Sequence, residues 1–255
     1  MRLDKFICKS TDYSLADAIA LIENKSVVVN DIIAIGASDQ VHKNNVVTLD
    51  GKILTSRSSR YLLLNKPIDM ICSNVDEKYP SVFNLLDVDR VTELHIAGRL
   101  DADTTGLVLI TDDGHWSFNL TSPKNKCEKV YKVVLSRPIS SDATKRFLEG
   151  VLLQGESKPT LPAKLHIIDP YNVFLTLTEG RFHQVKRMFS AIGNRVKSLH
   201  RQQIGNLELD VDIGHWRSLT QVEVEALSVN DKKTKDLDYS AEDNKKKQNN
   251  RKSQS

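Results

Sequence analysis

The residue types most able to do chemistry lie close together in residues 98–107, which read GRLDADTTGL. Arg99 stands two residues before Asp101, and Asp103 follows two residues later, ahead of two threonines, a glycine and an apolar run. This order predicts a loop that presents Asp101 at the mouth of a sheet, where a carboxylate serves as a nucleophile or a base. Aspartates that merely cap turns are the structural alternative, which stays open on composition alone. A metal site on the two aspartates is weaker, because the sequence offers no identifiable further ligand.

A second candidate is the basic stretch at residues 181–201. It contains six Arg or Lys side chains and two His side chains but no Asp or Glu, whereas residues 58–230 as a whole hold 21 basic and 21 acidic side chains. Such local clustering of positive charge predicts a surface that binds nucleic-acid phosphates. The alternative is an ordinary exposed helix, because apolar residues recur at helical spacing between residues 185 and 192.

A third segment, residues 121–132, adds four lysines and Tyr131, which enters a predicted strand. A tyrosine ring beside phosphate-binding lysines is able to stack on a base that has left its helix. A tyrosine in a strand is also a common part of the core, so this segment alone leaves both interpretations open.

The elements that must position these residues form two domains. Residues 1–57 predict an α-α-β unit, with two short helices followed by a hairpin and one more strand. The second helix is expected to begin at Ser14, a capping residue with Asp17 three positions on. The polar run SRSSR at residues 56–60 predicts the linker to the second domain.

Residues 58–230 predict an α+β domain with a mixed or antiparallel sheet, flanking helices and no alternating βαβ order. Strands are expected at residues 61–65, 107–111, 129–135, 165–168 and 173–178, and helices at residues 141–150 and 184–192. The apolar pattern then ends, and residues 231–255 predict a disordered basic tail. Eight basic and five acidic side chains lie in this tail, so it holds the whole formal net charge of +3.

Composition argues against several classes of protein. The 255 residues include no apolar run long enough for a membrane helix and no signal peptide after the start, so we expect a cytoplasmic protein. Cys8, Cys72 and Cys127 are far apart and predict reduced thiols rather than disulfides or a metal cluster. Glycine-rich loops of the GxGxxG and GxxxxGKS kinds do not occur, so no nucleotide cofactor is expected.

Together these segments resemble the RsuA family of pseudouridine synthases. The family's catalytic motif matches residues 98–107 nearly letter for letter, and the resemblance extends from residue 1 to about residue 228. Its other blocks occur in the family's order as LNKP, TDDGHW, TSP, EKVY, GRFHQVKRMF and LHR, starting at residues 64, 111, 121, 128, 180 and 199. Residues 1–57 resemble an S4 RNA-binding domain more loosely, because Leu15 replaces the basic residue often found after the capping serine.

The resemblance implies a cofactor-free enzyme that isomerises uridine to pseudouridine in RNA, by cleaving the N1–C1′ bond, rotating the uracil and forming a C5–C1′ bond. It implies that Asp101 attacks the sugar or withdraws its C2′ proton, that Lys186 keeps Asp101 ionised, and that Tyr131 stacks on the base. Arg99 would fill the space that the flipped nucleotide leaves. The other side chains expected to contact RNA are Lys124, Lys126, Lys129, Arg181, His183, Arg187, Arg195 and Arg201.

Within the family, the sequence is most similar to members that modify uridine 516 of 16S ribosomal RNA. His183 favours this substrate, because large-subunit relatives tend to carry Arg there. The expected partner is 16S ribosomal RNA or an assembling small subunit, bound by a monomer without a metal or nucleotide cofactor. The same reaction on 23S ribosomal RNA is the first alternative. A non-catalytic S4-type RNA-binding protein of the ribosome is the second, but such a protein has no need of Asp101, Tyr131 and Lys186 together.

Overall fold

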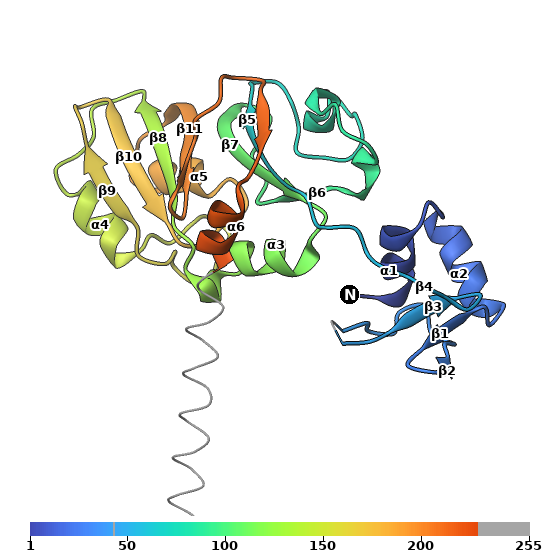
Figure 1. Ribbon diagram of the computed structural model, residues 1–255. Helices are drawn as coiled ribbons and strands as arrows, with labels where there is room; N and C mark the ends of the chain where they lie inside the picture. Colours follow the sequence, from blue (N-terminus) through green and yellow to red (C-terminus); the bar gives the residue numbers. More distant parts are fainter. Residues whose placement is uncertain (43, 229–255) are drawn as a thin grey trace, which may run out of the picture. The chain divides into compact units, whose positions relative to one another are not determined.

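The chain folds into two compact units that meet at the Ser59–Arg60 bond, two residues beyond the predicted boundary (Figure 1). The computed structural model describes residues 1–42 and 44–228. The predicted basic tail, residues 231–255, lies outside the described residues. Across the ranges that are described, every helix is too short or too polar to span a membrane.

The first unit is the expected pair of helices packed on a small sheet. Its helices are α1 (Leu3–Ser10) and α2 (Leu15–Glu23), and its strands are β1 (Val27–Val29), β2 (Ile32–Ile33), β3 (Val47–Leu49) and β4 (Lys52–Ile53). The strands lie in the order β2-β1-β3-β4 with antiparallel pairing. The predicted cap is confirmed, because the Ser14 hydroxyl accepts from the Asp17 amide and the Asp17 carboxylate accepts from the Ser14 amide. Apolar side chains such as Leu3, Ile7 and Ile22 form its core.

The second unit is built on one large mixed sheet. Its strands are β5 (Tyr61–Lys66), β6 (His95–Ala97), β7 (Thr104–Thr111), β8 (Lys129–Leu135), β9 (Lys164–Ile167), β10 (Asn172–Leu177), β11 (Val196–Ile204), β12 (Leu207–Glu208) and β13 (Trp216–Ser218). The main order is β13-β5-β7-β11-β8-β10-β9, with β6 beside β7 and β12 beside β11. Among these described strands, β7 and β11 form the single parallel pair. The predicted α+β class with a mixed sheet is confirmed.

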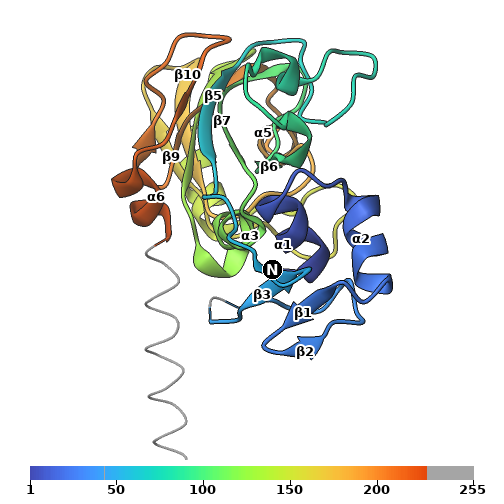
Figure 2. The same ribbon diagram turned by 45° about the vertical axis from the view of Figure 1, so that its right-hand side comes forward.

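Helices cover both faces of this sheet, as the views in Figures 1 and 2 show. They are α3 (Gly114–Thr121), α4 (Ala143–Glu149), α5 (Gln184–Ala191) and α6 (Gln221–Ser228), and short 3₁₀ turns lie at Val82–Leu85, Val91–Glu93 and Pro123–Asn125. Alternate residues of β5 explain the two layers: Leu64 packs with the residues of α4 and α5, and Leu63 packs with those of α3 and α6. The rings of Phe147 and Phe189 meet edge to face at 5.1 Å and join α4 to α5.

The central strand β11 and helix α3 were not predicted from the sequence. Strand β11 is rich in Lys, His, Arg and Gln, so its composition indicated an exposed surface rather than a strand between two neighbours. Helix α3 begins because the Asp113 carboxylate accepts from the amides of His115 and Trp116. Its apolar residues are too few to show a clear helical stripe in the sequence.

A row of paired residues crosses four strands next to residues 98–107. Lys66 of β5 pairs with Gly106 of β7, Gly106 with Arg201 of β11, and Arg201 with Tyr131 of β8. Gly106 has φ +105°, and a Cβ atom there would lie 2.3 Å from the backbone oxygen of Arg201 and 2.7 Å from its nitrogen. Glycine is therefore required for β7 and β11 to approach each other at this point.

We expect Gly106→Ala to lower the free energy of unfolding by about 3 kcal/mol. The new methyl group must push the β11 backbone away, and the alanine backbone must keep a positive φ. Gly214→Ala is the matched control. Gly214 also has a positive φ, but its Cβ would meet no described atom within 4 Å, so only the backbone strain of about 1 to 2 kcal/mol applies. Urea unfolding of both variants measures the difference, and equal losses would contradict the proposed contact.

Candidate active site

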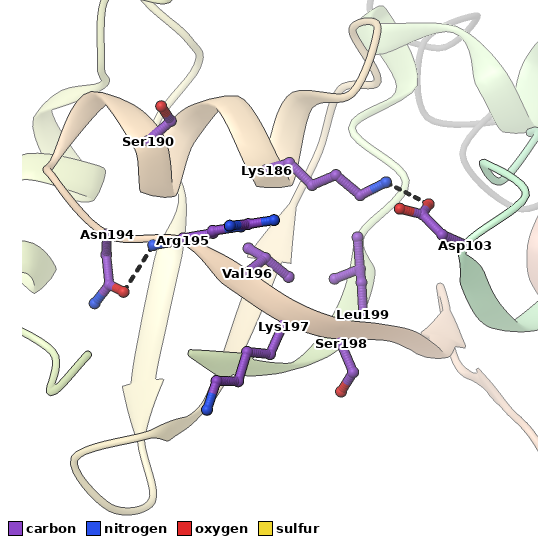
Figure 3. A pocket seen from close by; sticks show the side chains of 9 residues that line it. All are labelled: Asp103, Lys186, Ser190, Asn194, Arg195, Val196, Lys197, Ser198 and Leu199. Carbon is purple, nitrogen blue, oxygen red and sulfur yellow. Dashed lines mark hydrogen bonds and ion pairs between the residues drawn. The ribbon is translucent and has the colours of Figure 1, made fainter. Parts of the chain in front are cut away.

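One ammonium group joins the two loop carboxylates. The Lys186 Nζ atom, on the first turn of α5, donates to the Asp101 Oδ2 atom at 2.8 Å and also to Asp103, as Figure 3 shows for Asp103. The His183 ring stands at the start of the same helix, with its Nε2 atom 3.4 Å from the Asp101 Oδ1 atom. About 30% of the Asp101 side chain stays exposed, so this carboxylate is held and is still accessible to a ligand.

Lys186 and Asp103 stabilise each other's charged forms, as the pKa shifts of both groups indicate. Burial acts to lower the pKa of Lys186, but the hydrogen bonds and charges of Asp101 and Asp103 outweigh it and raise the pKa above its usual value. Burial acts to raise the pKa of Asp103, but the Lys186 ammonium outweighs it and the pKa is lowered. At neutral pH, Lys186 is therefore a cation and Asp103 an anion.

A second lysine, Lys66, holds the backbone of the loop that carries Asp101 and Asp103. Lys66 is fully buried at the end of β5, and its Nζ atom donates to the backbone oxygens of Pro67 at 2.9 Å, Ala102 at 3.1 Å and Thr104 at 2.8 Å. Burial lowers the pKa of Lys66, although nearby charged groups oppose that shift. The bonds to Ala102 and Thr104 hold the backbone on both sides of Asp103 and directly after Asp101.

Two residues that we expected to contact RNA are buried and bonded to the backbone. Arg201 is 1% exposed, and its guanidinium donates to the backbone oxygens of Leu107 and Gly98, both at 2.7 Å. Lys129 is buried and donates to the backbone oxygen of Cys127 at 3.0 Å. Both residues also line the cleft described below, so their contact with RNA stays a prediction, to which the structure adds a supporting role that the sequence did not show.

The arginines of the basic stretch are partly neutralised by carboxylates outside it. Arg181 forms ion pairs with Glu156 at 2.7 Å and with Glu179 at 3.1 Å, and Arg187 pairs with Glu156 at 2.8 Å. Both arginines also donate to backbone oxygens within residues 154–159. They therefore tie that loop to the start of α5. Counting charges within residues 181–201 could not show this, because both glutamates precede the stretch.

A cleft of about 920 Å³ opens beside the Asp101–Lys186 pair. Arg99, Tyr131 and His183 line it as well, so the structure brings the predicted catalytic residues together in one cavity. Phe182, which the sequence analysis did not single out, also lines the cleft; it is 75% exposed and its ring stacks on His183 with 3.8 Å between centroids. An exposed aromatic ring at a charged cleft is typical of a surface on which bases stack.

The remaining predicted RNA contacts lie away from this cleft. Lys124 and Lys126 are exposed on the turn that follows α3, and neither lines the cleft. Arg195 is exposed before β11 and lines a neighbouring hollow. In the described ranges, no three His, Cys, Asp or Glu side chains are grouped so that they would hold a metal ion.

The chain is similar to known enzymes over most of its length. The family described as RNA pseudouridylate synthase matches residues 60–191. "Ribosomal small subunit pseudouridine synthase A" of Haemophilus influenzae is 46% identical over 230 residues, which cover 89% of this chain and 99% of the relative. The protein of that name from Escherichia coli is 46% identical over 227 residues, or 88% and 98%. A solved "pseudouridylate synthase" is 46% identical and covers 89% of this chain and 99% of its own, with a TM-score of 0.66.

Replacing Lys66 by Met tests the support beneath the loop. We expect Lys66→Met to lower the free energy of unfolding by about 2 kcal/mol or more, because three backbone oxygens lose their donor and each unpaired buried group costs about 1 to 3 kcal/mol. Lys145→Met, at an exposed lysine of α4, is the control and should change stability by less than about 0.5 kcal/mol. Thermal unfolding of both variants decides the point; a Lys66→Met protein as stable as the control would contradict the support.

Proposed function

Because the chain belongs to the RNA pseudouridylate synthase family, we propose that it isomerises uridine 516 of 16S ribosomal RNA to pseudouridine and that Asp101 carries the reaction. The observation that carries this proposal is the Asp101 carboxylate, held by Lys186 at 2.8 Å and exposed to the cleft that Tyr131 also lines. The choice of the small subunit is supported by relatives of nearly the same length whose names specify that subunit.

The isomerisation requires an ionised carboxylate and no outside reagent. The N1–C1′ bond breaks, the uracil turns, a C5–C1′ bond forms and the C5 proton leaves, so the product has the composition of the substrate. Asp101 either attacks C1′ or withdraws the C2′ proton, and both routes begin from its charged form. The Lys186 ammonium donates to the Asp101 Oδ2 atom at 2.8 Å and fixes the position of that carboxylate, so we propose Lys186 as the partner of Asp101.

The target uridine must leave its stack to reach Asp101. We propose that Tyr131, with Phe182 at the entrance, provides the aromatic surface for the flipped base, because both line the cleft. Arg99, exposed on the same loop as Asp101, would take the space that the nucleotide vacates. Lys124, Lys126 and His183 remain candidates for contacts with the RNA strand.

The proposed enzyme is a monomer that works in the cytoplasm on 16S ribosomal RNA or an assembling small subunit, without a metal or nucleotide cofactor. The same reaction on 23S ribosomal RNA remains the first alternative. A purely RNA-binding role is disfavoured, because such a role gives no reason for an accessible carboxylate paired with a lysine inside a cleft.

Mapping pseudouridine in ribosomal RNA with and without the gene tests the substrate. We expect the modification at position 516 of 16S ribosomal RNA to disappear on deletion and to return with the wild-type gene. Loss of a pseudouridine from 23S ribosomal RNA alone would favour the alternative substrate. Unchanged pseudouridine in both RNAs would contradict the proposed function.

Substitutions of Lys186 test its pairing with Asp101. We expect Lys186→Met to lower kcat at saturating RNA by about 100-fold, which equals about 2.7 kcal/mol of transition-state stabilisation. Lys186→Arg keeps the positive charge and should restore part of the rate. Asp103→Asn is the control, because it leaves the Asp101–Lys186 hydrogen bond in place, and its rate should stay within about tenfold, or 1.4 kcal/mol, of wild type. Equal rates for Lys186→Met and wild type would rule out the role assigned to the pair.

A further inference from the structure

A second hollow, of about 440 Å³, lies beside the catalytic cleft. It opens between α5 and β11, and the Lys186–Asp103 pair closes one end of it (Figure 3). Lys186 and Leu199 line both cavities, so a single side-chain layer separates them. An RNA strand that leaves the cleft would therefore need to cross only these side chains to reach the hollow.

The positively charged side chains of residues 181–201 differ in whether they have a partner within the protein. Arg181 and Arg187 pair with Glu156, Lys186 pairs with the two aspartates, and Arg201 donates to buried backbone oxygens. Within the part of the chain that the structure describes, the side chains of Arg195 and Lys197 have neither a hydrogen bond nor an ion pair.

The two unpaired side chains point in different directions. In Figure 3, Arg195 extends through the space between α5 and β11, alongside Lys186 and toward Asp103, whereas Lys197, which also lines the hollow, points away from that pair. Among the described residues that line the hollow, Asp103 alone is acidic, whereas Lys186, Arg195 and Lys197 are basic; Lys186 pairs with Asp103 and also with Asp101. The hollow thus presents an unpaired guanidinium in a setting that favours an anion. A guanidinium offers a planar set of donors that matches the oxygens of a phosphate group.

We propose that this hollow is a phosphodiester subsite, in which Arg195 binds one phosphate of the substrate RNA strand next to the nucleotide that enters the cleft. The inference rests on the proposed function, since it takes RNA as the occupant of the cleft. Lys186 then has a second role, because its side chain forms the ridge over which the RNA strand passes between the two cavities.

The test combines a protein variant with neutral linkages in the RNA. A 16S-derived fragment is prepared with single methylphosphonate linkages, one at a time, on either side of the target uridine, and its Kd is measured for wild type and for Arg195→Gln. For wild type we expect one linkage to weaken binding by about tenfold, in the range of a lost charged hydrogen bond. Arg195→Gln should bind the unmodified fragment about tenfold more weakly, and that same linkage should cause no further loss.

Lys197→Gln is the matched control, because it removes the same charge from the lining of the same hollow, at a side chain that points away from the Lys186–Asp103 pair. Its binding should remain sensitive to the critical linkage. In a salt series, Arg195→Gln should reduce the slope of log affinity against log salt by about 0.7, the value for one phosphate of a single strand.

Additive losses at every linkage, or parallel salt lines for Arg195→Gln and wild type, would overturn the subsite. A wild-type protein that binds the fragment but forms no pseudouridine would instead count against the proposed function, and the linkage comparison would still be readable. The two failures are therefore distinguishable.

Discussion

The Lys186 ammonium is the constraint on which the rest of the site depends. It is shared by Asp101 and Asp103, two carboxylates of one short loop that would repel each other without a cation between them. It also joins that loop to α5, an element more than 80 residues away in the sequence. A loop and a helix that are distant in the chain thus become one site only when this charge is in place.

The scaffold keeps the loop in position for that pairing with two further buried cations. Lys66 and Arg201 direct their donors to backbone oxygens of residues 98–107 and Pro67 rather than to carboxylates. Burial of a charge is costly unless its hydrogen bonds are satisfied, so these contacts strongly restrict the loop conformation. Gly106, which lies between Lys66 and Arg201 in the row of paired residues, lets β7 and β11 approach each other closely. A carboxylate held in this way needs little rearrangement when substrate arrives, which is the condition for electrostatic catalysis.

The sequence predicted a large part of this arrangement. The capped helix at Ser14, the mixed sheet and the grouping of Asp101, Tyr131 and Lys186 at one cleft agree with the structure. Other features depended on contacts between distant segments. Nothing in the order of residues 181–201 shows that Glu156 forms ion pairs with two of its arginines, and the polar composition of β11 gave no sign of a central strand. Lys66 offered one usable signal, because it stands two residues after the apolar run at residues 61–64 and so was expected at the end of a buried strand.

The role of Asp101 is tested most directly by following the C5 hydrogen of the target uridine. Formation of the C5–C1′ bond releases that hydrogen, so tritium at C5 appears in water once for each isomerisation. In single-turnover reactions with saturating enzyme, wild type should release the label completely, and Asp101→Asn should release none while its RNA affinity stays within about tenfold of wild type. Measurable tritium release by purified Asp101→Asn would show that another group performs the reaction.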